Sequence, residues 1–161
     1  MDESGLGALL AMGMGFMLVF FAILIAFYVL KSIGLMTLAT NKGIENAWLA
    51  WIPIADLYIM GSIVEEMDLF GYRLTNLGMW LPVACIGGMV LGMIPILGFL
   101  VSLALMVFMI MFTYNLFKMY TESAVLYTVL SLLLGLFSIF IFIIRNNQPI
   151  NQGGYTPPTQ Y

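Results

Sequence analysis

The sequence predicts an all-α membrane protein, a bundle of four transmembrane helices plus one interfacial or re-entrant helix. Of its 161 residues, 63% are hydrophobic and only 8% are charged, and the mean hydropathy is +1.07. A soluble domain is typically about 25% charged, so this chain has too few charges to cover a water-facing surface. Its uncharged runs are also long enough to cross ~30 Å of hydrocarbon. The alternative is five spans, and it depends on how residues 47–64 are placed.

The first predicted span covers residues 6–30, which include no charged side chain. The residues before it are acidic, whereas a cleaved signal peptide begins with a basic region, so we expect the segment to stay in the mature chain. Small residues recur at every fourth position in it, and this spacing lets a second helix approach closely in lipid. The predicted helix-packing positions are Gly7, Ala11 and Gly15. Lys31 is predicted to end the span, and a polar connector is expected to follow it.

Residues 47–64 form the one long apolar segment that combines a central proline, two tryptophans and a carboxylate. The proline lacks a backbone donor and clashes with the preceding turn, so it should break the helix. Tryptophan and tyrosine concentrate at the headgroup level of membranes. We therefore predict a broken helix that lies in the interface or dips into it. The candidate functional residues are Trp48, Trp51, Pro53, Asp56 and Tyr58.

Three further spans are predicted, over residues 77–93, 96–116 and 124–144. A second face of small residues lies in the first of these, at Ala84, Gly88 and Gly92. Their four-residue spacing again predicts close helix packing.

The predicted membrane domain is a single unit of residues 1–145, and the composition changes abruptly after it. Residues 146–161 are rich in Asn, Gln, Gly and Pro, a composition that predicts a disordered tail. A second interpretation is that the Pro-Pro and terminal Tyr form a docking ligand for a partner.

Charge bias near span ends predicts the orientation, because basic residues favour the cytoplasmic side. With four spans and the N-terminus outside, four of the five basic residues face the cytoplasm and only Arg145 lies outside. With five spans and the same start, three would be inside and two outside. The count favours four spans with both termini outside.

Few residues offer chemistry. The chain has no histidine and one cysteine, Cys85, which excludes a zinc or haem site of the usual kind within one chain. Glu65, Glu66 and Asp68 lack the spacing of a calcium loop. The 14 methionines show no copper-binding spacing and are expected to pack. No cofactor is expected, and the scattered basic residues argue against a nucleic-acid partner.

The segment Ala47–Tyr58, AWLAWIPIADLY, with Lys42-Gly43 before it, resembles a family of small bacterial integral membrane proteins of unknown function. These carry a G-W-x-A-x-I-P-I-Y-N-x-Y type motif after the first span. The resemblance extends over most of residues 30–148 and implies a multi-pass protein of the bacterial cytoplasmic membrane. The chain departs from the motif at Ala55-Asp56, where Tyr-Asn is usual. The family lends no catalytic residues.

Two functions are expected from these features. The first is a non-catalytic membrane protein, not an enzyme. It would be embedded in the lipid bilayer and pack against copies of itself or against a larger membrane complex. The alternative is a small transporter or channel subunit in which the broken helix lines a pathway. Asp56 would then be its ion or proton group, because an ionisable residue at membrane depth is costly and commonly functional.

Overall fold

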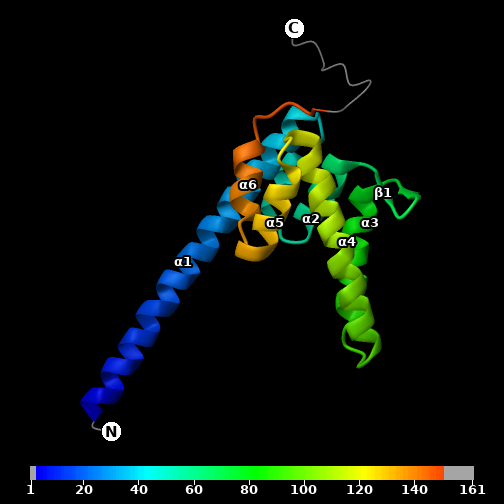
Figure 1. The fold of residues 1–161 in the computed structure, drawn as a ribbon. Coiled ribbons are helices and arrows are strands. Elements are labelled where there is room, and N and C mark those ends of the chain that lie inside the picture. Colours follow the sequence, from blue (N-terminus) through cyan, green and yellow to red (C-terminus); the bar gives the residue numbers. More distant parts are fainter. Residues whose placement is uncertain (1–2, 151–161) are drawn as a thin grey trace.

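The computed structural model describes residues 3–150, which fold into a helical body with two long projections (Figure 1). The ends of the chain, including most of the predicted tail, lie outside this range. The elements in chain order are α1 (Glu3–Asn41), η1 (Ala47–Trp51), α2 (Ala55–Val64), β1 (Met67–Leu69), β2 (Tyr72–Leu74), α3 (Leu77–Leu91), α4 (Leu97–Tyr120), α5 (Ala124–Leu134) and α6 (Phe137–Ile144).

Helix α1 is far longer than the predicted span. Its 39 residues extend for ~58 Å at 1.5 Å per residue, and its N-terminal half projects away from the body (Figure 1). Lys31 does not end the helix, which continues to Asn41. The predicted polar connector is helical because one of its faces is apolar and buried, through Leu35, Leu38 and Ala39.

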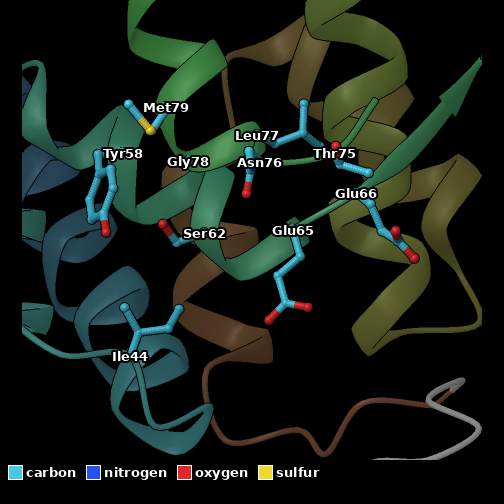
Figure 2. A pocket seen from close by; sticks show the side chains of 10 residues that line it. All are labelled: Ile44, Tyr58, Ser62, Glu65, Glu66, Thr75, Asn76, Leu77, Gly78 and Met79. Atoms are coloured by element: carbon cyan, nitrogen blue, oxygen red, sulfur yellow. The ribbon is translucent and has the colours of Figure 1, made fainter. Parts of the chain in front are cut away.

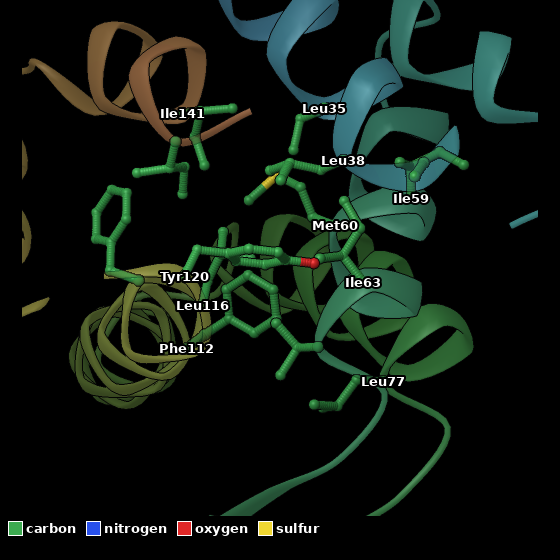
Figure 3. Packing of buried hydrophobic residues seen from close by; sticks show 14 of the residues in the cluster. Leu35, Leu38, Ile59, Met60, Ile63, Leu77, Phe112, Leu116, Tyr120 and Ile141 are labelled. Atoms are coloured by element: carbon green, nitrogen blue, oxygen red, sulfur yellow. The ribbon is translucent and has the colours of Figure 1, made fainter. Parts of the chain in front are cut away.

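The hydrophobic core lies where the C-terminal parts of α1 and α4 meet α2 and α6. Figure 3 shows Leu38 of α1, Ile63 of α2, Leu116 of α4 and Ile141 of α6 converging there. All four side chains are fully buried. Gly34 lets α1 and α6 approach closely, since a Cβ at this position would lie 2.9 Å from the carbonyl carbon of Ile141.

The predicted fourth span, residues 124–144, is not one helix. Gly135 adopts a left-handed conformation with φ 66° and separates α5, of 11 residues, from α6, of 8 residues. The two helices fold back on each other, with the rings of Tyr127 and Phe140 stacked 4.4 Å apart. The side-chain amide of Asn147 donates to the carbonyl of Tyr120, the last residue of α4, at 2.9 Å. The chain after α6 therefore lies beside the residues that precede α5.

Residues 47–64 are broken as the sequence predicts. The 3-10 helix η1 ends at Trp51, and α2 begins at Ala55 after an irregular stretch that holds Pro53. The carbonyl of Trp51 accepts a hydrogen bond from Tyr28 in the middle of α1, whereas the end of α2 contacts Lys42, just beyond the end of α1. The segment therefore runs back along α1 and then reverses.

Helices α3 and α4 form the second projection, a hairpin closed by the turn around Met93 (Figure 1). Their bounds lie close to the predicted spans 77–93 and 96–116. A small β-hairpin precedes them, with Asp68 paired to Arg73, and was not predicted. Its two turn residues, Phe70 and Gly71, both have positive φ, as a two-residue hairpin turn requires.

Two helices, over residues 5–41 and 97–120, are long and apolar enough to cross a membrane by length and composition. Helix α3 has 15 residues and spans only ~22 Å. The all-α class is confirmed at this level, because the described residues are helical apart from the β-hairpin and the connecting turns.

Candidate functional site

A buried ion pair joins α1 to α2. The Nζ of Lys31 lies 2.5 Å from Oδ2 of Asp56, and the two side chains are 22% and 8% exposed. The ring of Tyr28, one turn earlier on α1, lies 5.2 Å from the same ammonium. Asp56 therefore does not face open solvent or headgroups, because Lys31 covers it within the body.

The local backbone explains why the carboxylate points there. Asp56 lies in the first turn of α2, where the positive end of the helix dipole favours a negative charge. Ile54, just before the helix, has φ 75°, an unfavourable value for a β-branched residue. Such a conformation persists only where the surroundings hold it, and here the chain is held on α1 from both sides of the break.

Trp51 provides the contact on the other side of the break. Its carbonyl accepts a hydrogen bond of 2.6 Å from the hydroxyl of Tyr28, and its indole N–H donates to the sulfur of Met36 at 3.3 Å. Both partners belong to α1. The end of η1 is thus fixed at the same level of α1 as the ion pair.

A second lysine holds the opposite end of α2. Lys42, whose side chain is 6% exposed, donates from Nζ to the carbonyl of Ile63 at 2.6 Å and lies 3.1 Å from Oε1 of Glu65. A cation at a helix C-terminus satisfies a carbonyl that has no intrahelical partner. We call Lys31 and Lys42 the lysine clamp. They contact α2 near its two ends, Lys31 at Asp56 and Lys42 at Ile63.

A hollow of about 530 Å³ opens beside the C-terminal end of α2. Figure 2 shows the side chains of Tyr58, Ser62 and Glu65 around it, together with Asn76 at the start of α3. Because Glu65 is paired with Lys42, its carboxylate is already compensated. The hollow offers hydroxyl and amide groups but no pair of groups arranged as nucleophile and base.

The β-hairpin beside this hollow carries a separate surface ion pair between Arg73 and Glu66. The hydrogen bond from the guanidinium to Glu66, and the charge of that carboxylate, raise the pKa of Arg73. Exposed pairs contribute little to stability. This pair therefore adds little to the stability of the hairpin, and it leaves neither charge free for chemistry.

The predicted site residues fall into two groups. Asp56 is buried in the ion pair, whereas four others are exposed in η1, at the break or in α2: Trp48, Trp51, Pro53 and Tyr58. Only Asp56 and Trp51 have polar contacts that tie the segment to α1. Sequence reasoning missed Lys31 as the partner of Asp56. It also missed Lys42, which contacts the carbonyl of Ile63 and the carboxylate of Glu65 at the other end of α2.

The two faces of small residues also have different surroundings. A Cβ at Gly88 would overlap the side chain of Leu105 on α4, and Ala84 is half-buried in the same hairpin. Gly92 lies at the end of α3 against its own backbone. By contrast, Gly7 and Gly15 have nothing within 4 Å, and Ala11 is exposed.

Within residues 3–150, no three His, Cys, Asp or Glu side chains come together in a way that could hold a metal ion. No family model matches the sequence, and neither a curated protein nor a solved structure does.

Proposed function

We propose that this chain is a non-catalytic multi-pass membrane protein that acts as a structural or accessory subunit through helix–helix packing. The observation that carries the proposal is the isolation of the N-terminal half of α1. Every residue of 5–26 whose burial is described is exposed, and this half of the helix projects away from the body (Figure 1). Lipid alone can cover such a surface, but its row of small residues favours a second helix.

The proposed membrane arrangement has three crossing helices and two hairpins. Helices α1 and α4 are long enough to cross. Helix α3, which spans only ~22 Å, would cross beside α4 where the bilayer thins locally to match it. Residues 47–64 and 124–144 enter and leave at one end. Irregular backbone at membrane depth is tolerated where protein buries it, and both hairpins pack on α1.

Charge supports a cytoplasmic location for that end. Lys42 lies just beyond the C-terminus of α1, Lys118 is in the last turn of α4 and Arg145 follows α6. The carbonyl of Arg145 accepts a hydrogen bond from Asn41, so the end of α6 lies beside the end of α1. Basic residues near span ends favour the cytoplasm. The N-terminus would lie outside, in a bacterial cytoplasmic membrane.

The partner helix would lie along Gly7, Ala11 and Gly15, which share one side of α1. The glycines let two backbones come into contact, and this packing drives helix association where lipid removes the hydrophobic effect. A second copy of this chain or a larger membrane complex would supply the helix. The small residues around Gly88 on α3 cannot bind a partner helix in the same way, because Leu105 of α4 already packs against Gly88.

The test is the mass of the full chain in mild detergent and its cross-linking in native membranes. Gly7→Leu with Gly15→Leu should abolish the higher-mass species and leave the body folded. Gly13→Leu is the matched control, since Gly13 is also open within 4 Å but lies on the opposite side of the helix at 100° per residue. A chain that is monomeric throughout, or that loses association equally in both variants, would contradict the proposal.

A small transporter or channel subunit is the second candidate, and the buried carboxylate at a broken helix supports it. Transporters place such helix ends at their ion sites. Against it, Lys31 already neutralises Asp56, so a cation would have to displace the ammonium. The double variant Lys31→Met with Asp56→Leu removes the carboxylate without leaving a buried charge unpaired, and it should then abolish cation flux in proteoliposomes. If the wild-type chain carries no cation, this candidate fails.

A further inference from the structure

The α3–α4 hairpin contains a groove whose lining is rich in sulfur. Its volume is about 550 Å³, and residues of both helices and of the turn between them line it. Five of the side chains that line it carry sulfur: Cys85, Met89, Met93, Met106 and Met109. This groove lies apart from the lysine clamp and shares no residue with the hollow beside α2.

The methionines show no copper-binding spacing along the sequence, but the fold of α3 and α4 places these sulfur-bearing side chains around one groove. Cys85 and Met89 are four residues apart on α3, and Met106 and Met109 are three apart on α4. Residues at these spacings share a helix face. Gly88 has no side chain to fill the space between the helices, so Leu105 packs directly against it. The remaining lining residues add only one polar side chain, Ser102.

Thioethers differ from other apolar groups in one respect that matters here. Methionine sulfur is polarisable and sits on a side chain with three rotatable bonds. Thioethers are soft ligands that suit Cu(I), whereas Mg²⁺ and Ca²⁺ prefer oxygen ligands. Zn²⁺ is bound mainly by thiolate, imidazole and carboxylate groups, and this groove has no histidine or carboxylate and one cysteine. An ordinary packing role requires apolar volume but no sulfur, and the sulfurs at Met89, Met93 and Met106 are on largely exposed side chains.

We propose that the groove between α3 and α4 is a binding site for a soft monovalent metal cation, Cu(I) or Ag(I), held by methionine thioethers with Cys85 beside them. Thioethers are neutral, and a single positive charge is the smallest that a metal ion can bring into an apolar groove, where isolated charge is costly. Leu or Ile at the same positions would fill the groove equally well but could not ligate. This proposal does not depend on the proposed function, because it uses no residue of α1.

The full chain in detergent, under anaerobic reducing conditions, should compete with a chromophoric chelator for one equivalent of Cu(I). Met89→Leu with Met106→Leu should weaken that affinity by at least about tenfold, the scale on which altered metal-site shells act. Leucine conserves the volume of methionine and is well tolerated in packed positions, so the helical content should be unchanged. Zn²⁺ should not compete.

The matched control is Met12→Leu with Met14→Leu, which removes two exposed methionines of α1 that do not line the groove. Its affinity for Cu(I) should equal that of the wild-type chain. Sulfur-only coordination in X-ray absorption of the Cu(I) complex is the second expected readout. The proposal is overturned if the chain does not compete for Cu(I), if Zn²⁺ displaces it, or if both double variants lose affinity alike.

Discussion

The ammonium of Lys31 lies 2.5 Å from Oδ2 of Asp56 and connects the middle of α1 to the first turn of α2. The fold largely removes both charges from water, and the contact between them takes the place of the lost hydration. Bringing an ion pair out of water is costly, and losing one partner of a buried pair costs more than exchanging both for apolar groups. The pair therefore specifies where the broken segment sits on α1.

Removing one charge of this pair should destabilise the body strongly. For Asp56→Asn we expect a loss of about 3 kcal/mol in the free energy of unfolding, at the lower end of the range for a broken buried pair, since Lys31 is 22% exposed. Lys31→Met should cost a similar amount. The double variant Lys31→Met with Asp56→Leu should recover most of the loss. Denaturation in mixed micelles measures all three, and additive effects would show that the pair carries no coupling.

The other half of the lysine clamp leads to a local prediction. Lys42→Met leaves the carbonyl of Ile63 without its donor, so the last turn of α2 should fray while its first turn stays protected by Asp56. Hydrogen exchange should accelerate at Val64 and Glu65. Lys42→Arg keeps a cation at the helix end and is the control. Equal acceleration along the whole of α2 would mean that the clamp acts globally.

A close backbone contact makes Gly61 sensitive to any side chain. A Cβ there would overlap the carbonyl of Leu77, where α2 crosses the start of α3. Backbone cannot move aside as a flexible side chain can, so Gly61→Ala should cost about 1–3 kcal/mol, as overpacking does. Gly87→Ala is the control within α3, because nothing lies within 4 Å of its added Cβ. We expect it to be neutral or slightly stabilising through helix propensity.

The turn between α5 and α6 depends on a left-handed glycine. Gly135 has φ 66° with open space around it, so only the backbone conformation resists substitution. Gly135→Ala should cost about 1–2 kcal/mol, the usual cost of this conformation for a residue with a Cβ. Gly135→Asn should cost less, because asparagine adopts it more readily. If both variants unfold at the same point as the wild-type chain, the hairpin turn is not under this constraint.

The sequence predicted the break near Pro53 and the positions of α3 and α4, because proline and long apolar runs act locally. It did not predict that the helix continues through Lys31 to Asn41. A charge after an apolar run normally marks the membrane boundary, and nothing near Lys31 shows that its partner is Asp56. Pairing across such a separation is a tertiary property that local pattern does not contain.

Two other features lay beyond sequence reasoning for related reasons. Gly135 is one glycine in a long apolar run, and membrane helices tolerate glycine, so a continuous span was the reasonable prediction. The predicted packing positions of α1 and α3 have the same spacing, yet Gly88 meets Leu105 of α4 whereas Gly7 and Gly15 meet no other helix within residues 3–150. Spacing predicts that a face can pack but does not identify its partner.

The return of the chain at Gly135 determines the side on which the C-terminal end lies. Because Arg145 lies beside Asn41, a cysteine at Asn146 should react with an impermeant maleimide from the same side as one at Glu65. A cysteine at Gly5 should react from the opposite side. Cys85→Ser provides the background, since Cys85 is the one cysteine of the chain. A continuous fourth span would instead place Asn146 on the side of Gly5, so labelling from right-side-out and inverted vesicles distinguishes the two topologies directly.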